Sequence, residues 1–155
     1  MKIYLVQHGQ AAAKDIDPER PLTDAGSAEV TRMAHFLADA SPGIQRILHS
    51  GKLRAGQTAD IFAKTLSIEG NVEVITGISP NDSIAEFVPV MAGWRTDTLV
   101  VGHLPFMARL TSHLLTGDVD IAVVDYQPGT IVCLQQTDNN HWLMVSMVRP
   151  DLLGQ

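Results

Sequence analysis

The chain has 155 residues, 45% of them hydrophobic, and a formal net charge of −6. A chain of this size buries enough apolar surface to fold as one domain, residues 1–155, without disulfides or metal. The acidic balance and the lack of a basic stripe argue against a nucleic-acid partner, and no apolar run approaches the ~18 residues of a membrane span. Together with a lone cysteine, Cys133, these features favour the cytoplasm.

The first predicted element is a short strand that ends at a histidine. Ile3 to Val6 form an apolar run that is too short for a helix and typical of a strand buried on both faces of a sheet. His8 and Gly9 follow, and a glycine permits a sharp turn and the close approach of a ligand. Because ligands of open α/β sheets bind beyond the carboxyl ends of the strands, we expect chemistry at His8.

Strands and helices then alternate along the chain. Thr23 is expected to cap a helix with an apolar stripe from Val30 to Leu37, and Asp82 is a candidate cap for a weak helix that contains Pro89. The predicted elements cover residues 3–6, 24–40, 44–48, 52–66, 72–75, 83–93, 97–102 and 105–115, followed by strands alone over 121–124, 130–135 and 142–148. This order predicts an α/β fold, a three-layer α/β/α sandwich with a mostly parallel sheet and antiparallel strands at its C-terminal edge.

Three strand ends carry side chains that suit a phosphoryl group. His8 follows the first strand, Ser50 follows the second and leads into Arg54, and His103 follows the fourth. A guanidinium offers a planar fork of donors to two phosphoryl oxygens, and a neutral imidazole can attack phosphorus. The set therefore predicts a phosphoryl-transfer site, with Ser50 as a loop or helix-cap residue that sets Arg54.

The chain resembles the histidine phosphatase superfamily, whose fold is phosphoglycerate-mutase-like. The motifs that carry the resemblance lie between the N-terminus and about residue 106, in the family's order. They are Val6-Gln7-His8-Gly9, Arg20-Pro21-Leu22-Thr23 with Gly26, Ser50-Gly51-Lys52-Leu53-Arg54-Ala55-Gly56-Gln57-Thr58, and Val101-Gly102-His103-Leu104-Pro105. The short length, with no large insertion after the second helix, is most similar to the small SixA-type phosphohistidine phosphatases.

The resemblance implies a hydrolase of signal transduction that removes phosphate from phosphohistidine in a protein, such as a phosphotransfer domain. His8 would be the nucleophile that becomes phosphorylated, while Arg54 and His103 hold the phosphoryl oxygens. The implied phosphate-binding residues are Gln7, Gly9, Arg20, Arg54 and His103. No metal or organic cofactor is implied.

One residue departs from the family pattern, because Gln7 stands where the family has arginine in Arg-His-Gly. Glutamine keeps a neutral donor but loses the charge and the bidentate fork. Loss of a charged hydrogen bond, ~1.5–3 kcal/mol, would slow turnover by roughly ten- to a hundredfold or more. Candidates for a replacement cation are His49, Lys52 and Lys14. A different interpretation is a phosphate- or phosphoprotein-binding module without turnover.

The leaving group separates two enzymatic interpretations. Phosphate esters leave as poor alkoxides and need a proton donor, for which Asp82 and Glu86 are the carboxylates in the expected loop. A phosphorylated imidazole leaves as a nitrogen that already carries its own proton. The substrate is therefore phosphohistidine if neither carboxylate acts, and a small phosphate ester if one does. We expect the last fifty residues to be scaffold.

Overall fold

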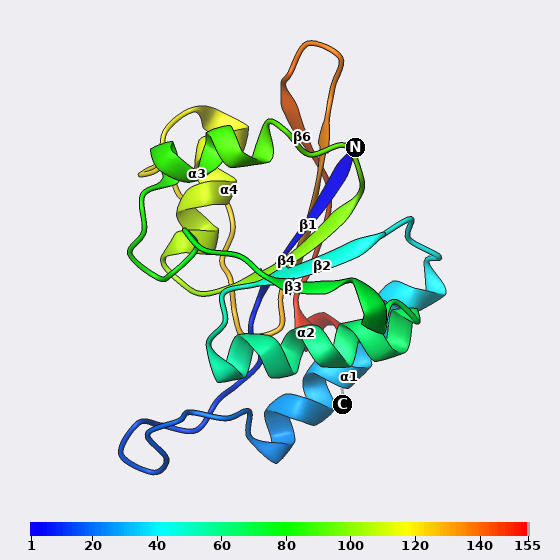
Figure 1. Cartoon of the computed structure of the whole chain (residues 1–155), viewed down its shortest axis with the longest axis vertical. Coiled ribbons are helices and arrows are strands. Elements are labelled where there is room, and N and C mark those ends of the chain that lie inside the picture. The colour runs from blue at the N-terminus through cyan, green and yellow to red at the C-terminus, as the bar shows by residue number, and fades with distance from the viewer. Residues whose placement is uncertain (155) are drawn as a thin grey trace.

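The computed structural model describes residues 1–154, which fold around a six-stranded sheet with the strand order β3-β2-β4-β1-β5-β6 (Figure 1). The first four strands in this order run parallel, and β5 and β6 each run antiparallel to the preceding neighbour. The strands are β1 (Lys2–Gln7), β2 (Arg46–His49), β3 (Val72–Val74), β4 (Thr98–Gly102), β5 (Ile131–Gln136) and β6 (Trp142–Val148). The predicted sheet, parallel with an antiparallel C-terminal edge, is confirmed.

Helices cover both faces of this sheet. They are α1 (Asp24–Asp39) and α2 (Leu53–Leu66) on one face and α3 (Ile84–Met91) and α4 (Phe106–Thr116) on the other, with short 3₁₀ helices at Glu69–Asn71 and Pro150–Leu153 (Figure 1). Successive residues of a strand point to opposite faces. Thus Tyr4 and Val6 pack under α1 and α2, whereas Ile3 and Leu5 pack under α3 and α4. The three-layer prediction is confirmed.

The first turn of α1 packs against the segment that follows β1. Thr23 caps the helix, as predicted, because its side-chain oxygen accepts a hydrogen bond from the backbone N–H of Gly26 at 2.9 Å. The predicted stripe from Val30 to Leu37 is buried. A Cβ atom at Gly26 would collide with the carbonyl oxygen of Gln10. Glycine therefore allows the helix to approach the segment that follows His8.

The apolar run 121–124 is not the strand that its composition predicts. It belongs to the segment between α4 and β5, which contains no strand. The side chain of Ile121 is 49% exposed and that of Val123 is 39% exposed. The segment pairs with no strand of the described sheet, so β-branched residues alone were a misleading signal here.

The cap of α3 also differs from the prediction. Ser83 is the capping residue, and its side chain accepts a hydrogen bond from the backbone N–H of Glu86. The Asp82 carboxylate instead accepts from the backbone N–H of Ser79 at 2.8 Å, which closes the preceding loop. The helix continues past Pro89 to Met91, so it is short, as expected, but it is not broken at the proline.

No helix within residues 1–154 is both long enough and apolar enough to cross a membrane.

Replacing Gly26 with alanine is expected to lower the free energy of unfolding by about 1–3 kcal/mol, because the new methyl group meets backbone atoms rather than a movable side chain. Gly70→Ala is the matched control, since a Cβ atom at Gly70 meets nothing within 4 Å. Urea denaturation of both variants measures the difference. Equal stability of the two variants would contradict the close approach of α1.

Candidate active site

Three neighbouring strand ends meet at one edge of the sheet. Strands β2, β4 and β1 are adjacent and parallel, so the residues that follow them, Ser50, His103 and His8, gather at the same edge. The ring centroids of His8 and His103 are 4.9 Å apart. The fold thus brings together the histidines that the sequence analysis singled out.

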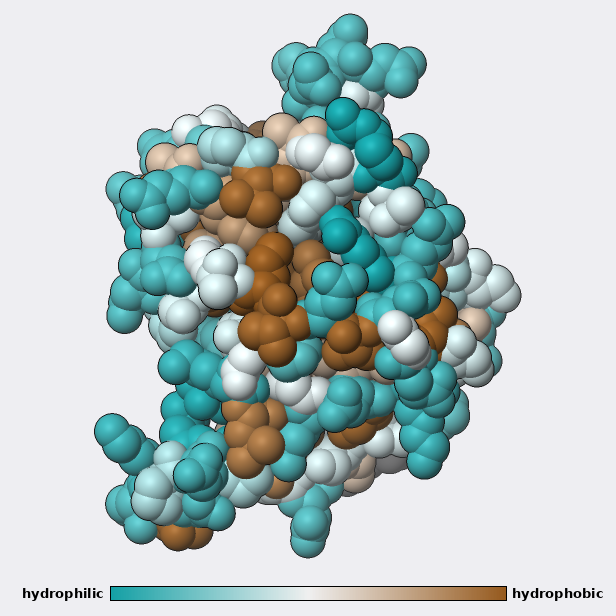
Figure 2. All heavy atoms as spheres, in the orientation of Figure 1, coloured by the Kyte–Doolittle hydropathy of each residue, from teal (hydrophilic) through white to brown (hydrophobic). Residues whose placement is uncertain are grey.

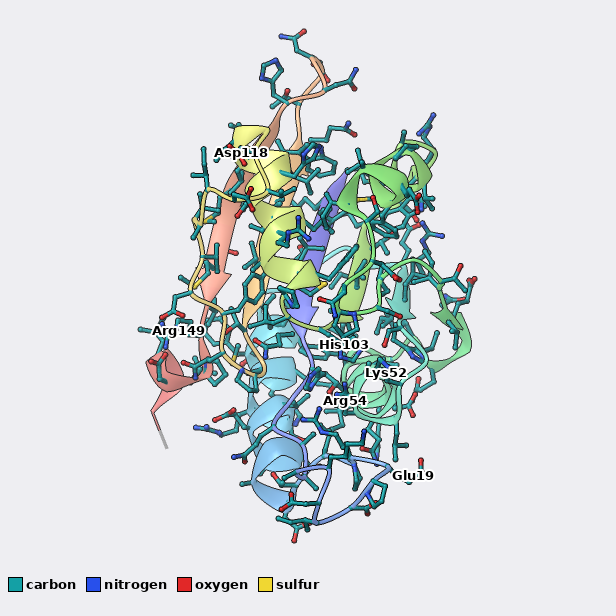
Figure 3. All side chains as sticks on the ribbon, turned by 90° about the vertical axis from the view of Figure 1, so that its left-hand side faces the viewer. Glu19, Lys52, Arg54, His103, Asp118 and Arg149 are labelled. Carbon is teal, nitrogen blue, oxygen red and sulfur yellow. The ribbon has the colours of Figure 1, made fainter. Side chains whose placement is uncertain are left out.

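These strand ends border an open pocket of about 360 Å³. Figure 3 shows Arg54 and His103 at this edge of the sheet, with Lys52 nearby. The pocket is lined by Gln7, His8, Gln10, Ala11, Arg20, Arg54, Pro80, His103, Leu104 and Pro128. Two arginines and no acidic side chain are among these lining residues, and such a concentration of positive charge suits an anion. Gly9, also expected at the site, is buried and is not among these lining residues.

The hydrogen bonds of His8 define which ring nitrogen carries a proton. Nδ1 lies 2.7 Å from the carbonyl oxygen of Gly9, and because a carbonyl oxygen only accepts, Nδ1 must donate. Nε2 then holds a lone pair, to which the Nε–H of Arg54 donates at 3.4 Å. Burial, followed by the charges of Arg54 and Arg20, lowers the pKa of His8 to about 4 against the opposing effect of its hydrogen bond to Gly9. His8 is therefore a neutral imidazole whose unprotonated Nε2 can act as a nucleophile.

His103 is almost fully buried, with 2% of its surface exposed. Its Nε2 lies 2.5 Å from the Oγ of Ser50, and its Nδ1 has no hydrogen-bond partner within the described chain. Burial is the largest cause that lowers the pKa of His103 to about 3, and neighbouring His8 and positive side chains add to it. Of the two positions predicted for Ser50, the structure shows the loop, between β2 and α2, because Lys52 is the cap of α2. The Ser50 hydroxyl instead holds the ring of His103 in place, and because a hydroxyl can donate or accept, this contact is compatible with either tautomer.

Both arginines of the pocket are held without a carboxylate, since the ion pairs found in residues 1–154 involve neither of them. Arg54 lies in the first turn of α2, and its carbonyl oxygen accepts from the Thr58 hydroxyl, whose oxygen accepts from the backbone N–H of Gly9. Arg20 has a φ of 50°, which costs a residue with a side chain about 1–2 kcal/mol. Its Nε–H donates to the carbonyl oxygen of Ala12 at 3.1 Å. Their charges thus remain available to an anion.

Gln7 lines the pocket, but its Oε1 is buried with no hydrogen-bond partner among residues 1–154. Its amide N–H groups are what it can offer to an anion. Of the three predicted replacement cations, His49 has a pKa lowered mainly by burial and is neutral at pH 7. Lys14 and Lys52 are both exposed, but only the charge of Lys52 is among those that lower the pKa of His103. Lys52 is therefore the candidate of the three whose charge acts on the site.

The carboxylates considered as general acids lie outside the pocket lining. Pro80 of the same loop lines the pocket, whereas Asp82 is bonded to Ser79 and Glu86 is exposed. Pro128 also lines the pocket, which corrects the expectation that the last fifty residues are scaffold alone. The sequence Gln-Pro-Gly around Pro128 indicates a turn, but no local signal says which part of the sheet this turn approaches.

Comparisons with known proteins agree with this geometry. The family model described as histidine phosphatase superfamily (branch 1) matches residues 3–77. Phosphohistidine phosphatase SixA of Escherichia coli strain K12 is 29% identical over 123 residues, which cover 76% of each protein. An uncharacterised protein of Picosynechococcus sp. is 26% identical over 160 residues, covering 94% of this chain and 96% of that protein.

Solved structures give the same result for the whole fold. The protein histidine phosphatase SixA complexed with tungstate matches with a TM-score of 0.85 and 25% identity over 99% of both chains. A protein of Agrobacterium tumefaciens described as a candidate phosphohistidine phosphatase SixA matches in fold with a TM-score of 0.75 and 24% identity, over 96% of this chain and 97% of that one. The chain therefore resembles the histidine phosphatase superfamily, and its SixA-type members in particular, and it is a phosphatase.

Proposed function

We propose that the protein is a phosphohistidine phosphatase that removes the phosphoryl group from a histidine of a phosphorylated protein. The observation that carries this proposal is the neutral imidazole of His8, protonated on Nδ1, in a pocket lined by Arg20 and Arg54. Relatives named phosphohistidine phosphatase support the substrate class. The SixA structure complexed with tungstate, a tetrahedral oxyanion like phosphate, shows that a protein of this fold binds such an anion, which supports an anion site here.

In the proposed reaction, the lone pair on Nε2 of His8 attacks phosphorus in line with the P–N bond of the substrate. The new P–N bond forms as the old one breaks, and the substrate imidazole, which enters protonated on its other nitrogen, takes the electron pair of the broken bond and leaves as a neutral imidazole. Arg54 turns from Nε2 to a phosphoryl oxygen and, with Arg20 and His103, stabilises the equatorial oxygens. Water then attacks the phosphorus of phospho-His8, which releases phosphate and restores the neutral imidazole.

The composition of the pocket favours phosphohistidine over a phosphate ester. An alkoxide leaving group needs a proton donor within hydrogen-bond reach, and no carboxyl group is among the described side chains that line the pocket. Asp82 is already bonded to its own loop, and Glu86 is exposed on α3. A leaving imidazole needs no such donor, so the proposed substrate is the one that these residues can serve.

Replacing His8 with alanine is expected to reduce phosphate release from a histidine-phosphorylated phosphotransfer domain by roughly a thousandfold or more, because no other nucleophile takes its position. Phosphate release with time is the measurement. His35→Ala is the control, since His35 is exposed on α1 and outside the pocket, and it is expected to match the wild type. Retention of full activity in His8→Ala would refute the assignment of the nucleophile.

We further propose that Lys52 supplies part of the charge that Gln7 lacks. Lys52→Met is expected to lower kcat roughly two- to fivefold, the range of a solvated charge, whereas Gln7→Arg is expected to raise it by about tenfold or more. The decisive quantity is the coupling between the two substitutions. In the Gln7→Arg background, Lys52→Met should lower kcat much less than it does in the wild type. Steady-state kinetics of the two single variants and the double variant measure it.

Lys64→Met is the matched control for this cycle, because Lys64 is an exposed lysine near the other end of the same helix. It is expected to leave kcat unchanged in both backgrounds. Strictly additive effects of Gln7→Arg and Lys52→Met would mean that Lys52 does not replace the arginine.

The two neutral histidines predict a pH dependence of stability. Their ordinary pKa of 6.5 falls to about 4 for His8 and about 3 for His103 in the folded protein, so between these values the unfolded chain binds more protons. Stability that is fully present above about pH 6.5 is thus lost as the pH falls toward 4. Urea denaturation at about pH 7, 5.5 and 4 should show a steeper loss for the wild type than for the double variant His8→Asn, His103→Asn. Parallel profiles would contradict the lowered pKa values.

A further inference from the structure

Residues 12–20 form a projecting segment, here called the arm, between β1 and α1. It extends away from the body of the protein at the lower left of Figure 1. An antiparallel bridge between Ala11 and Leu22 closes its base. Gln10, Ala11 and Arg20, at or next to this base, line the phosphate pocket. A molecule whose phosphoryl group occupies the pocket therefore lies beside the arm.

Hydrogen bonds, rather than a hydrophobic core, hold the arm in one conformation. The backbone N–H groups of Ile16 and Asp17 both donate to the carbonyl oxygen of Ala13, each at 3.0 Å. Arg20 donates from its backbone N–H to the carbonyl oxygen of Asp17, and Glu19 donates to the Asp17 carboxylate, again at 3.0 Å. The arm is therefore already ordered before binding, so little conformational entropy is lost when a partner binds to it.

This ordered arm presents an apolar side chain to water. Ile16 is 79% exposed, more than any other large hydrophobic residue in the described chain. Asp15 and Glu19 lie beside it, exposed and without side-chain ion pairs among residues 1–154. Figure 2 shows the arm as a mainly hydrophilic projection with a hydrophobic spot at its end, and Figure 3 shows Glu19 below Arg54 and Lys52.

Two further exposed apolar side chains lie at or near the strand ends that border the pocket. Leu104, which lines the pocket, is 37% exposed, and Leu53 at the start of α2 is 43% exposed. Ile16 is not among the residues that line the pocket, and a free phosphorylated amino acid offers little surface beyond the group that enters it. A folded protein that carries the phosphoryl group spans both, and its basic groups would complement Asp15 and Glu19.

We infer that the arm is a docking surface for the protein substrate, with Ile16 packing on an apolar surface beside the phosphorylated histidine and with Asp15 and Glu19 facing basic side chains. This inference rests on the proposed function and adds the element that distinguishes a protein substrate from a small one. Burial of one isoleucine side chain corresponds to about a tenfold or larger change in affinity. The acidic contacts lie at the surface and are weakened by salt.

The test compares two probes, a histidine-phosphorylated phosphotransfer domain and the free amino acid phosphohistidine. Ile16→Ser is expected to raise KM for the domain about tenfold or more and to leave kcat and the kinetics of free phosphohistidine unchanged. The double variant Asp15→Asn, Glu19→Gln is expected to raise KM for the domain severalfold at low salt and to remove most of its salt dependence. Circular dichroism and urea denaturation verify that each variant is folded.

Matched controls lie elsewhere on the surface. Leu152→Ser replaces a residue that is 73% exposed near the C-terminus, and the pair Asp138→Asn, Glu73→Gln removes two exposed acids outside the arm. Both controls are expected to behave as the wild type. Unchanged KM for the domain in Ile16→Ser, or an equal loss with both probes, would overturn the inference.

The two proposals fail in different ways. Release of phosphate from free phosphohistidine by the wild type tests the proposed function independently of the arm, because this small substrate is not expected to contact the arm. If the wild type hydrolyses neither probe, the proposed function is wrong, and the arm is then judged by binding of the phosphorylated domain. A dissociation constant that Ile16→Ser weakens about tenfold supports the docking surface, and one that it leaves unchanged refutes it.

Discussion

The hydrogen bond from Nδ1–H of His8 to the carbonyl oxygen of Gly9 is the constraint on which the site depends. It fixes the proton on one ring nitrogen and leaves the lone pair on the other, next to Arg54. The backbone N–H of Gly9 is in turn bonded to Thr58, which is bonded to the carbonyl oxygen of Arg54. One connected set of bonds therefore positions His8, just after β1, and Arg54 of α2 relative to each other.

The electrostatics of the pocket follow from what surrounds this bond. Arg20 and Arg54 lie near the buried imidazole of His103 and the half-buried imidazole of His8, and the described side chains that line the pocket include no carboxylate to balance them. The arrangement disfavours further protons on the histidines and favours a doubly charged phosphoryl group. Gln7 adds only a neutral amide to this pocket, so the positive charge among its described lining residues comes from Arg20 and Arg54.

Local patterns predicted the elements whose formation depends on nearby residues. The strand before His8, the Thr23 cap and the buried stripe of α1 are confirmed, because burial and capping leave a short-range signature. The contact between Ser50 and His103 was missed, since it depends on β2 lying next to β4 in the sheet. The position of Pro128 in the pocket lining likewise depends on the pairing of β5 with β1. The strand predicted over residues 121–124 does not form, because a composition typical of strands does not provide a neighbouring strand to pair with.

The most direct test of this account is the location of phosphate on the enzyme during turnover. The protein is mixed with a ³²P-labelled, histidine-phosphorylated phosphotransfer domain, quenched within milliseconds in alkali, digested, and mapped by mass spectrometry. The account predicts an acid-labile, alkali-stable label on the peptide that contains His8, attached at Nε2 because Nδ1 is held by Gly9. Label on Ser50 or on another residue, or phosphate release with no labelled enzyme at any time, would contradict it.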